Sequence, residues 1–150
     1  MSPATPSIAA DCPLCREDGG TLLWRNAQLR VIRVNDPDYP GFCRVIWQAH
    51  VREMSDLTPA QQQQLMATVF AVEKVVRSLF APDKINLASF GNMVPHLHWH
   101  VIARWQDDRH FPEPVWGQPQ RTPSAVRPTV NDAALSAALT EALAAASTTS

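Results

Sequence analysis

Short runs of apolar, β-branched and aromatic residues recur along the chain, and clusters of turn residues separate them. In the second run, Leu29 and Val31 would share one face of a strand, with Arg30 and Ile32 on the other. The pattern predicts β-strands over residues 21–25, 28–34, 42–48, 84–89 and 94–104. Residues 35–41, rich in Asn, Asp, Pro and Gly, predict a loop between the second and third strands.

The longest apolar stripe at helical spacing begins after residue 58. Thr58 can act as the N-cap, Pro59 suits the first helical position, and Gln61 stands where a capping box needs it. The turn at residues 81–83 ends the pattern. We expect a core-facing helix without chemistry of its own, whose apolar stripe consists of Leu65, Val69, Val72, Val76 and Leu79.

A narrower stripe of Leu135, Leu139 and Leu143 predicts a last helix over residues 133–146, capped from residues 129–132. This helix can pack on its own domain, cover a partner subunit or fray. Several antiparallel-compatible strands and one long helix predict an α+β fold. The length supports a single core: residues 1–10 are expected to be disordered, 11–117 to form the domain, and 118–150 to be a linker and C-terminal helix.

The composition narrows the functional classes. The formal net charge is −1, so no basic excess predicts nucleic-acid binding, although a small anionic ligand needs only local donors. No apolar run approaches membrane-spanning length, and residues 1–10 lack the apolar segment of a signal peptide. Three cysteines, an odd number, do not suit a secreted disulfide scaffold, which favours a cytoplasmic location.

Three of the five histidines stand at alternate positions, as His96, His98 and His100. Side chains two residues apart on a strand share a face and lie about 6.6 Å from each other. The sequence therefore predicts a row of imidazoles on one face of the strand over residues 94–104.

This row of histidines has three interpretations. A purely structural role is the least favoured, because three buried imidazoles without partners would cost several kcal/mol. The row can bind a metal ion, since His-x-His on a strand places two ligands on one face. Alternatively, one neutral imidazole attacks a phosphorus atom while its neighbours bind the phosphoryl oxygens.

Residues 96–102, His-Leu-His-Trp-His-Val-Ile, resemble the signature of the histidine triad (HIT) family, His-φ-His-φ-His-φ-φ, where φ is apolar. The likeness extends to the Pro-Gly turn and strand at 40–46, to His50 before the long helix, and to residues 84–87. It covers residues 12–116. The resemblance implies a HIT-like α+β fold, with an antiparallel sheet of about five strands, one long helix and a C-terminal helical appendage.

The resemblance also implies a nucleotide hydrolase or transferase that cleaves a phosphoanhydride or phosphoramidate bond at the α-phosphorus. By position, His98 is the nucleophile and forms a nucleotidyl-phosphohistidine intermediate. His96, His100 and Asn92 would assist, and Gly91 would allow close approach of the backbone. The implied ligands are purine nucleotide conjugates such as dinucleoside polyphosphates and nucleoside phosphoramidates. No cofactor is required for this chemistry, and a homodimer is expected.

The chain departs from the family's pattern on the substrate side. Met93 stands where many members have a serine, which removes a hydroxyl contact to the leaving group. The family's ribose-binding acid has no plain match, and Asn35 and Asp36 are the nearest candidates, although an Asp before Pro is also a common turn former. Asn86, on the strand before the triad, is a further candidate for substrate binding.

Cys12 and Cys15 form a Cys-x-x-Cys turn, a spacing that suits zinc but is also found in reduced cysteines without a metal. Some branches that this chain resembles pair such cysteines with two histidines, which would be His50 and His96. A structural zinc ion held by these four residues would pin the N-terminal segment to the sheet and leave His98 for chemistry.

Two alternatives to the phosphohistidine enzyme remain open: a metal-dependent hydrolase with the histidine row as ligands, and a nucleotide-binding module without turnover. Arg104, directly after the triad, can meet a phosphate or lie on the surface. Trp116 can stack on a base or on a partner subunit, or pack within the domain.

Overall fold

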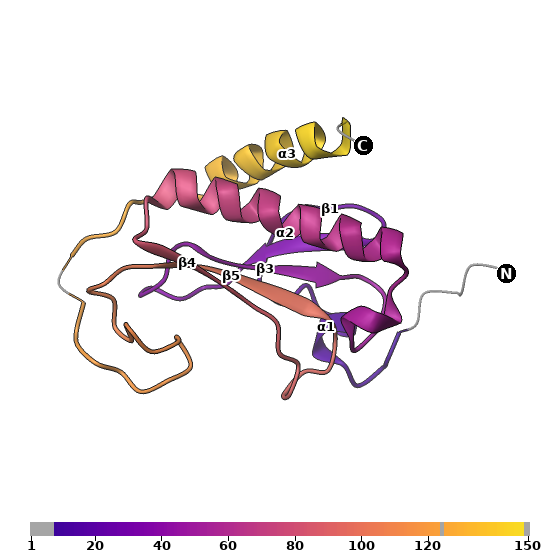
Figure 1. The fold of residues 1–150 in the computed structure, drawn as a ribbon, viewed down its shortest axis with the longest axis horizontal. Helices are drawn as coiled ribbons and strands as arrows, with labels where there is room; N and C mark the ends of the chain where they lie inside the picture. Colours follow the sequence, from indigo (N-terminus) through magenta and orange to yellow (C-terminus); the bar gives the residue numbers. More distant parts are fainter. Residues whose placement is uncertain (1–7, 124, 149–150) are drawn as a thin grey trace, which may run out of the picture.

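A five-stranded sheet forms the centre of the molecule, and two long helices lie on one of its faces (Figure 1). This computed structural model describes residues 8–123 and 125–148. The elements are α1 Pro13–Arg16, β1 Thr21–Arg25, β2 Leu29–Arg33, β3 Phe42–Trp47, the 3-10 turn η1 Met54–Asp56, α2 Pro59–Phe80, β4 Lys84–Ala88, β5 His98–Arg104 and α3 Asp132–Thr148. The α+β class and both predicted helices are confirmed.

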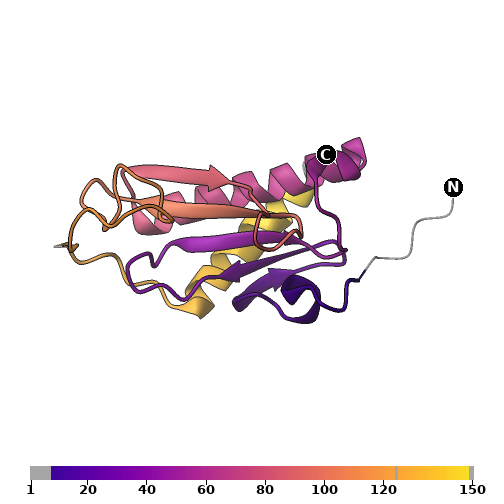
Figure 2. The same ribbon diagram turned by 90° about the horizontal axis from the view of Figure 1, so that it is seen from below.

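The strands run in the order β1-β2-β3-β5-β4, and every neighbouring pair is antiparallel. Alternation along the central strands divides their side chains between two environments. Val45 and Val101 face α2 and are fully buried in the main core. Arg44 and His100 are register partners on the opposite face, which the two long helices leave uncovered (Figure 2). The polar residues of the central strands therefore gather on the face away from α2.

The long helix α2 begins as its sequence predicts. The Thr58 side chain accepts the amide of Gln61, and the Gln61 side chain accepts the amide of Thr58, which completes the capping box. The helix ends at Ala81, whose left-handed conformation (φ 47°) lets its amide bond to the carbonyl of Arg77. Pro82 follows at once and cannot continue the helix.

The last helix packs on its own domain. Leu135 and Leu139 are fully buried in the main core, which α3 reaches beside α2 and β1. Asn131 accepts the amide of Ala134 and so caps the helix, and the Ser136 hydroxyl donates to the carbonyl of Leu23. Of the three roles that the sequence left open for this helix, the structure supports packing within the chain.

The fifth strand is shorter than predicted, because β5 begins at His98 and not at residue 94. Pro95 has no amide hydrogen for a ladder, and β4 already ends at Ala88. The Leu97 amide bonds instead to the carbonyl of Val51. The prediction that three histidines share one strand face is therefore wrong for His96, which precedes the strand.

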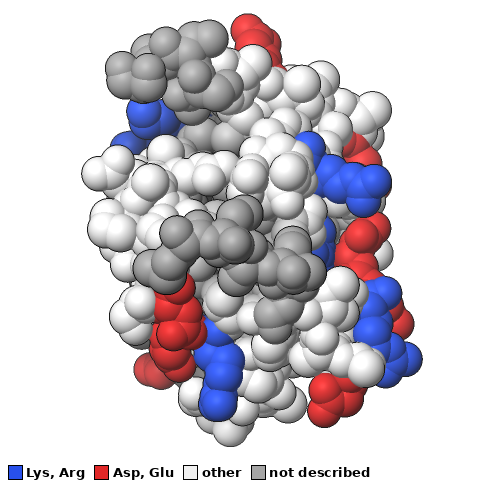
Figure 3. All heavy atoms as spheres, turned by 90° about the vertical axis from the view of Figure 1, so that its right-hand side faces the viewer, with Lys and Arg blue, Asp and Glu red and all other residues white. Residues whose placement is uncertain are grey.

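Residues 1–7 of the segment expected to be disordered lie outside the described residues. Ala9, near the end of that segment, accepts the amide of Cys12 and donates to the Cys15 sulfur, so it is held against α1. None of the described helices is long and apolar enough to cross a membrane. On the face shown in Figure 3, acidic and basic side chains are interspersed, in keeping with a net charge near zero.

Candidate active site and metal centre

A pocket of about 700 Å³ opens on the sheet face away from the long helices. Arg44 from β3 and His98 and His100 from β5 form its floor. Residues 90–94 and residues 114–117 supply most of the surrounding wall, and Pro13, Leu14 and Gly19 complete it near α1. Two of the three triad histidines therefore meet in one cavity of nucleotide size.

The His98 ring is oriented by the backbone just before it. Its Nδ1–H donates to the carbonyl oxygen of His96 over 2.5 Å. Because a carbonyl only accepts, this bond fixes the tautomer and leaves Nε2 with a free lone pair. Burial lowers the pKa of His98, the bond to the carbonyl opposes this, and the charge of Arg44 lowers the pKa further. The ring is therefore neutral near pH 7.

His100 lies deeper, with 4% of its surface exposed, among aromatic rings. The Trp116 and His98 ring centroids are 4.8 and 5.0 Å from its own. Burial, with smaller effects from the charges of His98 and Arg44, lowers its pKa to about 3. Its Nδ1 is buried and has no hydrogen-bond partner among residues 8–123 and 125–148. His100 is thus a neutral ring with an unused polar atom beside the candidate nucleophile.

The loop between β4 and β5 brings two further predicted residues, Gly91 and Asn92, to the pocket. Gly91 has φ 114°, a conformation that favours glycine. Asn92 is exposed, so its side-chain amide is open to solvent. Met93 is 94% exposed on the rim, where it leaves the pocket without the hydroxyl that a serine would bring.

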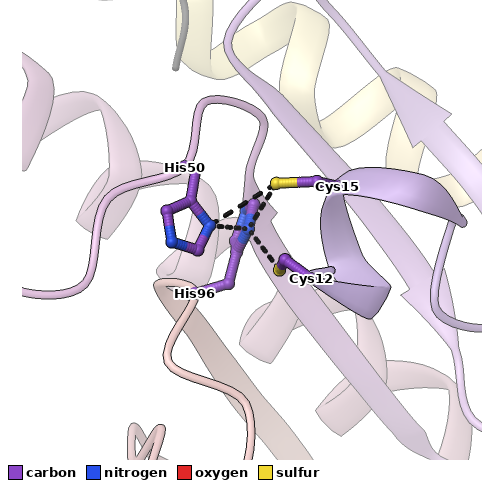
Figure 4. Close-up of side chains that lie close together, drawn as sticks. All are labelled: Cys12, Cys15, His50 and His96. Atoms are coloured by element: carbon purple, nitrogen blue, oxygen red, sulfur yellow. Dashed lines mark hydrogen bonds between the residues drawn. The ribbon is translucent and has the colours of Figure 1, made fainter. Parts of the chain in front are cut away.

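His96 belongs to a second cluster, with Cys12, Cys15 and His50 (Figure 4). The His96 Nδ1 lies 3.4 Å from the Cys12 sulfur, 3.5 Å from the Cys15 sulfur and 3.3 Å from the His50 Nδ1. The His50 Nδ1 is 3.5 Å from the Cys15 sulfur, and all four ligand atoms lie within 4.8 Å of one another. The four predicted ligands therefore converge from α1 and from two loops.

Four distances within this cluster, of 3.3–3.5 Å, match those between the ligands of a tetrahedral metal ion. Bonds of about 2.3 Å to sulfur and about 2.0–2.1 Å to nitrogen place tetrahedral zinc ligands roughly 3.3–3.8 Å apart. The His96 Nε2–H donates to the carbonyl of Trp47 over 2.6 Å, which leaves Nδ1 bare toward the cluster. Burial lowers the pKa of His96, so the ring is neutral, as a ligand must be. The cluster could hold a metal ion.

Arg30 secures the turn that carries the two cysteines. Its guanidinium donates to the carbonyls of Leu14 (2.6 Å), Glu17 (3.1 Å) and Asp18 (3.0 Å). A further bond of 2.6 Å joins it to the Gln48 side chain. The three carbonyls lie in or just after α1, so Arg30 anchors this helix to β2 next to the cysteine-histidine cluster.

His98 and His100 stand outside every metal-ligand cluster that the described residues form. Only His96 of the triad contributes to such a group; it lies against Cys12, Cys15 and His50 (Figure 4) and does not line the pocket. This arrangement does not support the alternative in which the three histidines share a catalytic metal.

Three predicted substrate-binding residues lie elsewhere. Asn35 and Asp36 line a separate hollow beside Pro40 and do not reach the pocket, and the Asp36 carboxylate accepts the amide of Asp38 as a turn former does. The side-chain oxygen of Asn86 accepts a hydrogen bond of 2.7 Å from Arg104, and Asn86 does not line the pocket.

Arg104 neither meets the pocket nor lies on the surface, because it forms a buried ion pair with Asp108 at 2.7 Å. Its guanidinium also donates to the carbonyl of Glu113 over 2.7 Å, in the loop that leads to Trp116. Burial would raise the pKa of Asp108, but bonds from Arg104 and from two backbone amides outweigh burial and lower it to about 2. This network holds the Trp116 loop over the pocket.

Arg44 was missed as a site residue. It alternates with Cys43 and Val45, which are fully buried on the α2 face, so period-two counting places it on the histidine face. The pairing of β3 with β5, which brings Arg44 beside the histidines, depends on segments far apart in the sequence and cannot be read from either one alone.

The family model described as HIT domain matches residues 16–107. The chain is similar to AP-4-A phosphorylase of Mycobacterium tuberculosis, with 28% identity over 116 residues, 73% of this chain and 58% of the relative. It is similar to bis(5'-nucleosyl)-tetraphosphatase [asymmetrical] of Schizosaccharomyces pombe, with 32% identity over 95 residues, 59% of this chain and 52% of the relative. The chain thus spans about half the length of the curated relatives it matches.

Among solved structures, the fold is similar to the histidine triad protein blr8122 from Bradyrhizobium japonicum. The TM-score is 0.70 at 29% sequence identity, and the match covers 92% of this chain and 99% of that one. The family model covers more than half of the chain and includes His50 and the three triad histidines, but not Cys12 and Cys15. The chain therefore belongs to the HIT domain family.

Proposed function

We propose that this protein cleaves dinucleoside polyphosphates at the α-phosphorus of a nucleotide, with the His98 Nε2 as the nucleophile. The observation that carries the proposal is the bond from His98 Nδ1–H to the His96 carbonyl, which directs a bare nitrogen to a pocket of about 700 Å³. Both curated relatives carry names of enzymes that act on dinucleoside tetraphosphates. Nucleoside phosphoramidates remain a second substrate class.

In the first step, the Nε2 lone pair forms a bond to the α-phosphorus while the bond from phosphorus to the bridging oxygen breaks. The electron pair leaves with the departing polyphosphate, an anion that needs no proton near pH 7. Positive charge develops on the imidazole, and the His96 carbonyl that accepts Nδ1–H stabilises it.

In the second step, an acceptor oxygen bonds to phosphorus as the phosphorus–nitrogen bond breaks, and its electron pair returns to Nε2. With water as the acceptor, the product is the nucleoside monophosphate and a proton is released to solvent. With inorganic phosphate, the product is the diphosphate, as the name of the mycobacterial relative suggests for that protein. The pocket is open enough for either acceptor, so we include both in the proposal.

The remaining site residues assist in different ways. Asn92 can donate its amide to the leaving group, and the neutral His100 can donate or accept beside the phosphoryl oxygens. Both nitrogens of His96 are engaged away from the pocket, by Trp47 and by the cysteine cluster. Its contribution to chemistry is therefore the backbone carbonyl that orients His98.

We further propose that Cys12, Cys15, His50 and His96 hold a structural zinc ion, which when bound would fix α1 against the loop before β5. The cysteines are free thiols and would bind as thiolates, so this role suits a reducing compartment such as the cytoplasm. A homodimer stays a prediction from the family resemblance.

The proposal is tested with diadenosine tetraphosphate and the His98→Ala variant. We expect kcat/KM to fall at least about 1000-fold while AMP still binds, because the nucleophile is lost and the pocket remains. Wild-type protein denatured at alkaline pH during turnover, where a phosphorus–nitrogen bond to histidine persists, should carry a mass increase of one nucleotidyl group, absent from the variant. A wild-type protein that binds AMP but neither turns over nor acquires this mass would be a binding module, contrary to the proposal.

A further inference from the structure

Three arginines project from the sheet face that carries the pocket, and two of them are fully committed to the protein. Arg30 donates four hydrogen bonds to backbone and side-chain oxygens. Arg104 pairs with Asp108 and also donates to Asn86 and Glu113. These two guanidinium groups hold the neighbouring loops in position.

Arg44 is different, because most of its donors have no acceptor. Its one hydrogen bond is a 3.5 Å contact from Nη1 to the Gly19 carbonyl. Its Nε is buried and has no partner among the described residues. The ion pairs formed by the described part of the chain do not include Arg44, and its guanidinium carbon lies 5.9 Å from the Phe42 ring centroid.

The charge environment of the pocket sharpens this contrast. Among the described residues that line it, Arg44 carries the one formal charge and there is no carboxylate. An arginine charge left without an anionic partner in a partly buried place costs stability. Such a guanidinium, with several free N–H groups, matches the oxygens of a phosphate.

Sheet register places Arg44 close to the candidate nucleophile. Arg44 pairs directly with His100, and His98 is the next residue on the same face of β5. The floor of the pocket thus consists of one cation and two imidazoles from adjacent strands. The oxygens of a phosphoryl group bound at His98 would therefore lie over this floor, close to the Arg44 side chain.

We propose that Arg44 binds the non-bridging oxygens of the phosphoryl group that His98 attacks. This inference rests on the proposed function and adds the residue that recognises the phosphate common to all its substrates. The guanidinium donates to oxygens whose charge increases as the phosphorus becomes five-coordinate, so it stabilises the transition state more than the ground state. Since Arg44 would bind the α-phosphoryl group, its stabilisation of the transition state does not depend on the leaving group.

The test compares Arg44→Met and Arg44→Lys with Arg109→Met, which changes an exposed arginine outside the pocket that forms a 3.5 Å ion pair with Asp38. We expect Arg44→Met to lower kcat/KM about 100- to 1000-fold, and by the same factor for diadenosine tetraphosphate and adenosine 5'-phosphoramidate. Arg44→Lys should recover part of this loss because it restores the charge, and Arg109→Met should match the wild type.

A binding measurement tests Arg44 independently of turnover. Titration calorimetry should show at least 10-fold weaker AMP binding to Arg44→Met and unchanged adenosine binding, since only AMP has the phosphate. If the wild type cleaves neither substrate, the proposed function fails, and this pair of titrations still decides the role of Arg44.

Three outcomes would overturn the inference. Equal weakening of AMP and adenosine would indicate a general loss of the pocket, and no weakening of either would show that Arg44 does not contact the ligand. A kinetic loss confined to the tetraphosphate would move Arg44 to the leaving group. Arg44→Met should also unfold at the wild-type temperature or above it, because the substitution removes an unpaired charge and keeps the aliphatic stem.

Discussion

The two ends of β5 hold the loops around the pocket by different chemistry. Before the strand, His96 joins two cysteines and His50 in a group of four ligand atoms within 4.8 Å. After the strand, Arg104 and Asp108 form a buried ion pair whose atoms are satisfied by the protein itself. The first arrangement would be completed by the zinc ion that we propose, whereas the second is complete as folded. On this proposal, order on the α1 side of the pocket depends in part on the ion and is conditional, and order on the Trp116 side is intrinsic.

The largest effect is expected at the intrinsic end. Asp108→Asn should destabilise the fold by about 3–5 kcal/mol, because it leaves the Arg104 charge buried without a partner. Urea unfolding measures the loss. The double variant Arg104→Met with Asp108→Asn serves as the control and should recover part of the stability, because no unpaired charge remains. A loss below about 1 kcal/mol in the single variant would show that the ion pair does not hold this loop.

Acid titration checks the same ion pair. The folded-state pKa of Asp108, about 2, lies below its usual value of 3.8. The carboxylate therefore contributes stability above about pH 4, and this contribution is lost as the pH falls toward 2. Asp108→Asn should not show this part of the acid transition.

Metal removal tests the conditional end. A zinc chelator should lower the unfolding free energy by roughly 2.7 kcal/mol if zinc was present at 100 times its dissociation constant. Cys12→Ser should mimic the chelator, whereas Cys43→Ala, which changes a thiol outside the cluster, should leave the chelator effect intact. Specific activity of the still-folded protein should persist. Immediate loss of activity without any change in unfolding would favour a catalytic metal instead.

A smaller effect is expected between the two ends, at His100. Its folded-state pKa of about 3 lies below the ordinary value of 6.5, so the unfolded chain takes up the proton first. Its contribution to stability is full above pH 6.5 and is lost as the pH falls from there toward 3. Between pH 7 and pH 5 the wild type should lose about 2 kcal/mol more than His100→Gln. Equal slopes for both proteins would show that His100 is not buried as a neutral ring.

Local patterns allowed the regular elements to be predicted. The capping box at Thr58 and the apolar stripes of α2 and α3 depend on residues a few positions apart, and both helices form as expected. The first four strands agree with their predicted ranges to within two residues at each end. The sequence did not predict whether α3 packs on its own domain or on a partner subunit, because an apolar helix face can pack against either.

The irregular parts of the site were less accessible. The apolar pattern predicted a strand that includes Pro95. In the structure the Leu97 amide instead donates to the carbonyl of Val51, and His96 lies beside the cysteines. The four candidate metal ligands were predicted through the family resemblance, and the spacing of the cysteines alone left their association with the histidines open. Arg44 and Arg104 look alike in sequence, but the acceptors around them come from distant segments and give them opposite roles.

His96 serves two structures at once. Its imidazole belongs to the thiol cluster, while its peptide oxygen sets the rotation of the ring two positions later. In the proposed mechanism, a substitution that moves the backbone at this residue would turn the His98 Nε2 without changing any residue that lines the pocket. The direction of the proposed nucleophile therefore depends on a residue outside the pocket wall.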